Sequence, residues 1–273
     1  GRKRPPVDMM RDLQICVSPN TLMALSVETC VARHTGDRTE QQDRVGIFGH
    51  ASLPGMLMAV VADGMGGHTG GAMAAEQVLL KAKQNFEMFA PREESAEKLL
   101  RGILTESHLV IKLTRFTSEQ DPHSTAVVLL LQPGRVDWVH CGDSRLYHFR
   151  EGRLIKRTVD HSLVEELSRK GMISAAAALS HPQRNVLMSC LGAEREPRIE
   201  YATQAGLVAG DTFLLCSDGL WGDLGEDEIA EHLANRTARE AAQALISLAR
   251  SRSDGYGDNI SVAIVRLVEA PPR

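Results

Sequence analysis

One stretch of the chain constrains the fold more than any other, because in it a buried strand leads directly into an acid and a run of glycines. Residues 56–62 form an apolar run with the length and composition of a strand buried on both faces. Asp63 follows this run, and five of the next eight residues are glycines. Glycine lets a backbone approach a bound group closely, so the stretch is typical of a metal or phosphate site. Taken alone, it also fits a strand-to-helix turn with an aspartate cap.

Length and composition indicate a folded globular protein. A chain of 273 residues can bury a substantial core, and 43% hydrophobic with 24% charged residues is ordinary for this class. The net charge of −4 predicts no nucleic-acid partner. No segment approaches the ~18 apolar residues that cross a bilayer, so we expect no membrane partner. Five widely spaced cysteines without a C-x-x-C pair predict free thiols and a cytoplasmic protein.

The chain divides into a short lead-in and one domain. Residues 1–21 contain three prolines and no sustained period, so we expect them to be loosely ordered. Residues 22–273 contain neither an internal repeat nor a linker, which predicts a single domain. Within it, residues 172–192 lack a clear period and indicate a surface flap.

Hydrophobic periodicity predicts a mixture of helices and antiparallel strands. Short connections join strands within 125–141 and within 145–156, and such connections cannot make a parallel crossover. Ser162 and Glu165 form a capping box that opens a short helix ending at Gly171. Apolar positions at three- and four-residue intervals predict further helices over 72–89, 95–116, 226–234 and 237–250. Further strands are expected at 22–33, 45–48, 211–216 and 260–267.

Five aspartates recur at the ends of these strands. Three follow a strand, one precedes the last strand, and one lies just ahead of 45–48: Asp63, Asp143, Asp218, Asp258 and Asp43. If the strand ends converge, the carboxylates repel one another unless cations neutralise them. Ligand sets made of oxygen alone select hard cations such as Mg²⁺ or Mn²⁺. Two such ions can activate a bridging water and neutralise a phosphoryl group during in-line attack.

Arg38 lies five residues before Asp43 in a loop that also contains Gly36. A guanidinium there can grip a phosphate as a planar fork. An arginine in a loop is, however, more often a solvated surface charge.

The motifs occur in an ordered set that resembles a known family. They are R-T-E-Q-Q-D (38–43), D-G-M-G-G-H (63–68), S-T (124–125), G-D-S-R-L-Y (142–147), D-H-S-L-V (160–164), S-D-G-L-W (217–221) and G-D-N-I-S-V (257–262). This set resembles the metal-dependent protein phosphatases of type 2C, the PPM family, in their bacterial form. The resemblance extends from about residue 26 to 267.

The resemblance implies an α+β fold and a set of site residues. The fold is a sandwich of two antiparallel β-sheets flanked by α-helix pairs, with a dinuclear metal site at one end. The ligands implied for two Mn²⁺ or Mg²⁺ ions are Asp63 as the bridge, the Gly64 carbonyl, Asp43, Asp218 and Asp258. Asp143 matches, with Asp218, a third and weaker metal, Arg38 matches the phosphate-gripping arginine, and residues 160–192 match the flap that faces substrate.

The implied activity is the hydrolysis of phosphoserine and phosphothreonine in proteins by a monomeric bacterial enzyme that counters a Ser/Thr kinase. A relative that acts on a phosphorylated regulator of a sigma factor is a second possibility within the same class. The alternative from another class is a catalytically weak or inactive relative that binds phosphoproteins as a regulatory module. Such a relative would normally have lost a metal acid, and all five are present. Gln42 stands where a glutamate is common and predicts weaker binding of one metal. Met65 stands where eukaryotic members carry a histidine proposed as general acid.

Overall fold

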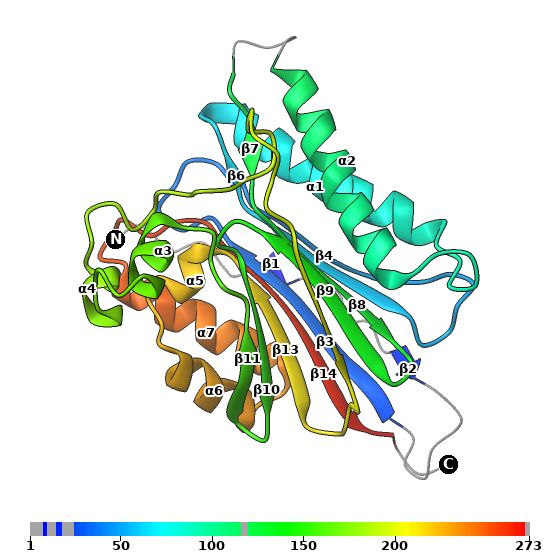
Figure 1. Cartoon of the computed structure of the whole chain (residues 1–273). Helices are drawn as coiled ribbons and strands as arrows, with labels where there is room; N and C mark the ends of the chain where they lie inside the picture. Colours follow the sequence, from blue (N-terminus) through cyan, green and yellow to red (C-terminus); the bar gives the residue numbers. More distant parts are fainter. Residues whose placement is uncertain (1–7, 10–14, 18–24, 116–119, 271–273) are drawn as a thin grey trace.

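The chain folds into a layered α-β-β-α sandwich, which confirms the expected fold class (Figure 1). This computed structural model describes residues 8–9, 15–17, 25–115 and 120–270. Two antiparallel sheets pack face to face in the middle, and helices cover the outer face of each sheet.

One sheet has five strands in the order β12-β9-β8-β5-β4, and the other has seven, in the order β1-β3-β14-β13-β10-β11 with β2 also paired to β3. The five-stranded sheet contains β4 (Arg44–Gly49), β5 (Leu57–Ala62), β8 (Ala126–Gln132), β9 (Arg135–Cys141) and β12 (Glu200–Ala205). The larger sheet contains β1 (Asp8–Met9), β2 (Ile15–Val17), β3 (Leu25–His34), β10 (Arg145–Arg150), β11 (Arg153–Arg157), β13 (Asp211–Cys216) and β14 (Ile260–Glu269). A small ladder joins β6 (Gly64–Met65) to β7 (His123–Ser124).

Alternating side chains along the strands build the cores between the layers. In β5, Leu57, Ala59 and Val61 face the other sheet and pack with residues such as Phe213 and Val265. The intervening residues of β5 pack against α1 (His68–Glu87) and α2 (Ala96–Thr114). On the opposite side, the larger sheet packs against α5 (Asp218–Trp221), α6 (Glu226–Ala234) and α7 (Ala238–Arg252).

Most predicted elements are present, and the differences have local causes. The helix expected from residue 72 begins at His68, so the last two glycines of the motif are already helical. The strand β12 was not predicted, because its sequence EYATQA has no apolar run and it lies half-exposed at the sheet edge. The single turn α5 was also not predicted.

Three of the expectations fall partly outside the described residues. Of the lead-in 1–21, the structure describes two short strands, both paired to β3. The beginning of the strand expected at 22–33 and the last residue of the helix expected at 95–116 lie outside the described residues. Within the described part, α2 has Ser95 as N-cap, which accepts a hydrogen bond from the Lys98 N–H.

Free cysteines were expected, and four described ones are free: Cys30, Cys141, Cys190 and Cys216. Among the described helices, none has the length and apolar character required to cross a membrane.

Candidate metal and phosphate site

The predicted acids meet at a pocket of about 410 Å³ at one end of the sandwich. The predicted site residues that line it are Arg38, Asp63, Gly64, Asp143, Asp218 and Asp258. Asp43 is fully buried, and its charge acts on Asp63. The structure therefore brings all seven predicted site residues into one neighbourhood, although they come from segments far apart in the sequence.

Both sheets contribute strand ends to this pocket. In the five-stranded sheet, β5 ends at Ala62, directly before Asp63. In the larger sheet, β13 ends just before Ser217-Asp218, and β14 begins just after Asp258-Asn259. Because β13 and β14 are antiparallel neighbours, the end of one lies beside the start of the other.

Asp43 and Asp218 are each left with one oxygen that has no partner. The Ser217 hydroxyl donates to Asp43 Oδ2 at 2.6 Å, whereas Asp43 Oδ1 and Asp218 Oδ1 are buried without a hydrogen bond. Burial, and then the charge of Asp218, raises the pKa of Asp43 to about 7. Burial and the charge of Asp258 raise the pKa of Asp218 to about 6. Both groups favour a neighbouring positive charge at neutral pH.

The same forces act on two further acids of the cluster, Asp63 and Asp143. Burial and the charges of Asp43 and Asp218 hold the pKa of Asp63 well above its ordinary value. Burial, with the charge of Asp218, does the same to the pKa of Asp143. Buried carboxylate oxygens without partners form a donor set that fits hard divalent cations. The described pocket residues thus pass this chemical test for Mn²⁺ or Mg²⁺.

Close backbone packing fixes the position of Asp63. A Cβ on Gly64 would lie 1.9 Å from the Gly71 carbonyl oxygen, so only glycine fits there. The Thr125 hydroxyl accepts a hydrogen bond from the Asp63 N–H at 3.1 Å, and the Ser124 hydroxyl donates to the Asp63 carbonyl at 3.1 Å. The S-T motif therefore orients the backbone of the acid.

Arg38 lies at the open edge of the pocket. Its guanidinium donates to Asp258 Oδ2 at 2.7 Å, and its side chain is 59% exposed. The guanidinium is therefore both within reach of the acid cluster and accessible to an incoming anion.

Sequence reasoning missed the residues that hold the Arg38 loop. Asn259 Oδ1 accepts from the Gln42 N–H at 2.7 Å, and its amide donates to the Thr35 and Glu40 carbonyls. Asp37 makes a two-oxygen ion pair with Arg250 on α7, with both contacts at 2.7 Å. Asn259 was visible in the G-D-N motif, but no spacing in the sequence indicates a pair 213 residues apart.

The predicted flap borders the same pocket. It contains the capped helix α3 (Leu163–Arg169) and a second short helix, α4 (Ala175–Leu179), that the sequence did not predict. The returning segment pairs with the flap's beginning through a bridge between Ser162 and Leu187. Asn185 and Leu187 line the pocket.

The chain is similar to known proteins over most of its length. The family model for "Protein phosphatase 2C" matches residues 32–250. The chain is 35% identical over 235 residues to "Serine/threonine phosphatase stp" of Listeria monocytogenes, covering 84% of this chain and 90% of that one. It is 33% identical over 217 residues to "Serine/threonine protein phosphatase PstP" of Mycobacterium tuberculosis, covering 79% of this chain but only 41% of the longer protein.

A solved structure of a PstP catalytic domain in complex with two manganese ions resembles the fold closely. The TM-score is 0.75 at 28% identity, and the match covers 90% of this chain and all of that one. A relative of this chain therefore binds two Mn²⁺ ions on the same fold.

Proposed function

Because the chain belongs to the protein phosphatase 2C family of serine/threonine phosphatases, we propose that it is an active, metal-dependent enzyme that hydrolyses phosphoserine and phosphothreonine in proteins. The observation that carries the proposal is the convergence of five aspartates on one pocket, two with buried oxygens that lack any partner. An inactive relative would have no reason to retain a carboxylate cluster that opposes its own folding.

The residues proposed to hold two cations are Asp63 as the shared ligand, the Gly64 carbonyl, Asp43, Asp218 and Asp258. Asp143 and Asp218 would hold a third cation more weakly. When bound, the ions supply an activated water and neutralise the phosphoryl charge during in-line attack.

The chain's own residues supply position and charge. The hydrogen bonds of Ser124 and Thr125 to the Asp63 backbone hold in place the residue whose carboxylate the two ions would share. Arg38 can exchange its contact with Asp258 for the phosphate oxygens, which it would meet as a planar fork. The Asp37–Arg250 pair keeps the loop of Arg38 against α7 while this exchange occurs.

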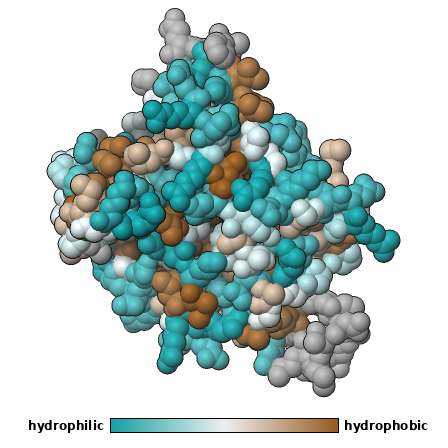
Figure 2. Space-filling model, in the orientation of Figure 1, coloured by the Kyte–Doolittle hydropathy of each residue, from teal (hydrophilic) through white to brown (hydrophobic). Residues whose placement is uncertain are grey.

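The flap favours a protein substrate over a small molecule. The flap exposes Met172, Val186 and Met188, and the last two flank Leu187, which lines the pocket. Figure 2 shows hydrophobic residues gathered over α3 and α4, at the left of a face that is otherwise mostly hydrophilic. A phosphorylated peptide could place its phosphate in the pocket and its neighbouring side chains on this surface. The substrates proposed on this basis are the targets of a bacterial Ser/Thr kinase and the kinase itself.

The experiment is hydrolysis of p-nitrophenyl phosphate and of a phosphothreonine peptide with Mn²⁺, with Mg²⁺ and with EDTA. We expect turnover that requires the metal and that disappears in Asp63→Asn, while the exposed Asp227→Asn variant on α6 behaves like wild type. Absence of turnover in folded wild-type protein with either metal would reject the enzyme and favour the phosphoprotein-binding module.

A further inference from the structure

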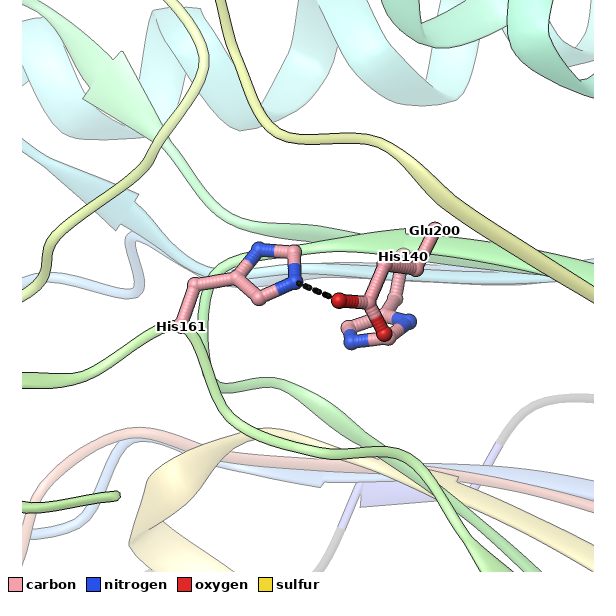
Figure 3. A group of neighbouring side chains, drawn as sticks. All are labelled: His140, His161 and Glu200. Atoms are coloured by element: carbon pink, nitrogen blue, oxygen red, sulfur yellow. Dashed lines mark ion pairs between the residues drawn. The ribbon is translucent and has the colours of Figure 1, made fainter. Parts of the chain in front are cut away.

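A second cluster of ionisable groups, two of them buried and one partly exposed, lies outside the acid pocket (Figure 3). It consists of His140 on β9, His161 at the start of the flap and Glu200 on β12, and their ligand-type atoms lie within 4.8 Å of one another. Both histidines are almost completely buried, and their rings stack with centroids 4.7 Å apart and planes 28° apart. His161 Nε2 lies 3.5 Å from Glu200 Oε1.

The hydrogen bonds of His161 argue against a metal at this cluster. The Gly142 N–H donates to His161 Nδ1 at 3.2 Å, so Nδ1 must carry a lone pair. In the neutral ring the hydrogen then resides on Nε2, the nitrogen that faces Glu200. A cation on Nε2 would move this hydrogen to Nδ1, where it would face the Gly142 N–H. Metal-bound histidines instead donate their second N–H to an acceptor. Two stacked rings also cannot both direct in-plane lone pairs at one ion.

The cluster instead holds the turn that precedes Asp143. The backbone N–H of His161 donates to the Gly142 carbonyl at 2.9 Å. His161 therefore binds Gly142 through both its backbone and its side chain. Gly142 has a φ of +99°, and a Cβ there would lie 2.7 Å from the Thr125 side chain. The next residue, Asp143, lines the pocket, and its carbonyl accepts from Trp221 Nε1 at 2.9 Å.

Burial and His140 keep the ring of His161 neutral despite the charge of Glu200, and His140 also stacks on the ring. His140 Nε2 donates to the Val159 carbonyl at 2.8 Å, which fixes the ring that stacks on His161. Burial and the adjacent His140 lower the pKa of His161 to about 4. At neutral pH the ring is therefore uncharged, and Nδ1 remains free to accept from Gly142.

We propose that His161 is a positioning residue whose neutral ring, oriented by His140 and Glu200, fixes the Gly142-Asp143 turn and thereby the carboxylate of the weaker metal site. This inference rests on the proposed function, which assigns Asp143 to that site. The structure gives it a specific form, because the part of His161 that matters is a hydrogen-bond acceptor at the Nδ1 position.

A matched pair of variants tests this acceptor. His161→Asn places an amide oxygen near the position of Nδ1, whereas His161→Phe retains a stacked ring without an acceptor. Binding of Mn²⁺ is measured directly from the electron paramagnetic resonance of the free ion. We expect His161→Phe to weaken the weaker class of Mn²⁺ sites by about tenfold, as for other residues that orient ligands, and to leave the tighter class unchanged. His161→Asn should remain within about threefold of wild type, because the acceptor is restored.

Two results would overturn the proposal. One is that His161→Phe binds Mn²⁺ at the weaker sites as tightly as wild type does, or at least as tightly as His161→Asn does. The other is a Zn²⁺ ion bound by wild type and lost in His161→Phe, which would make the cluster a metal site. If His161→Phe does not fold by circular dichroism, Glu200→Ala on the half-exposed edge strand replaces it. That variant should weaken the same sites by about threefold, and no change would contradict the proposal.

The readout separates this inference from the proposed function. Turnover of wild type is measured in the same buffer as Mn²⁺ binding. A wild type that lacks turnover but shows His161-dependent weak binding refutes the proposed activity and supports the positioning role. A wild type that turns over substrate, but whose weaker Mn²⁺ sites do not respond to His161→Phe, supports the proposed activity and refutes the positioning role.

Discussion

The metal-free acid cluster should oppose folding at neutral pH, and Asp43→Asn tests this most sharply. Asp43 has a pKa of about 7 against an ordinary value of 3.8, because of burial first and the charge of Asp218 second. Between these two values the native chain retains a proton that the unfolded chain has lost, so the free energy of unfolding falls as pH rises. A shift of about three units corresponds to about 4 kcal/mol, fully expressed above pH 7.

Asparagine should remove most of this cost. Its amide oxygen can still accept from the Ser217 hydroxyl, which now donates to Asp43 Oδ2. In EDTA at pH 8 we therefore expect Asp43→Asn to melt above wild type, by roughly 5–10 °C for a domain of this size. At pH 4 the difference should nearly vanish. With Mn²⁺ the order should reverse, because the variant lacks a charged ligand. Differential scanning calorimetry across pH 4 to 8 measures all three effects.

Asp211→Asn is the matched control, because Asp211 is also fully buried but belongs to a different network. Although burial favours its neutral form, hydrogen bonds from His148 and Arg150 hold its pKa at about 2. Asp211→Asn should therefore melt at a lower temperature than wild type in both EDTA and Mn²⁺. The expected loss in the free energy of unfolding is about 3 kcal/mol. If Asp43→Asn instead lowers the melting temperature in EDTA at pH 8, as Asp211→Asn does, the buried charge of Asp43 does not oppose folding.

Three further predictions concern the pocket and its supports. Arg38→Ala should lower kcat/KM for p-nitrophenyl phosphate about 100-fold, and Arg38→Lys should lie between wild type and Arg38→Ala. Equal kcat/KM values for wild type and Arg38→Ala would exclude a phosphate contact. Asp37→Asn should cost about 1 kcal/mol in urea unfolding at pH 7, a value reduced for solvent screening. Hydrogen bonding to Arg250 lowers the pKa of Asp37 to about 2, so this cost should disappear as pH falls from 4 towards 2. A cost that does not change with pH would contradict this role of the Asp37 charge. Gly64→Ala should cost about 3 kcal/mol in the same assay, since its Cβ meets the Gly71 carbonyl, and an unchanged midpoint would exclude the clash.

Local patterns predicted the strand ends and hence the acids. Each acid adjoins a run that is apolar enough to be buried, as in β5, where every residue is buried. Such a run has few alternatives to a central strand, so the position of Asp63 at its end follows directly. The capping residue Ser162 also marked the start of α3, because its side chain accepts a hydrogen bond from the Glu165 N–H.

Features that depend on contacts distant in sequence could not be predicted. The early start of α1 requires Gly71 to pack against Gly64, a contact between two backbones that periodicity does not report. The strand β12 exists because β9 offers it a free edge, not because its own residues favour a strand. The role of His161 requires Gly142 as a partner, and only the folded chain places the two together.

Anomalous diffraction from crystals soaked in MnCl₂ would show whether the aspartates form a two-metal centre. Two strong Mn²⁺ peaks are expected about 4 Å apart, with Asp63 in contact with both ions and Asp218 and Asp258 in contact with one or both. Crystals of folded protein at neutral pH with no Mn²⁺ peak in the pocket would contradict this expectation.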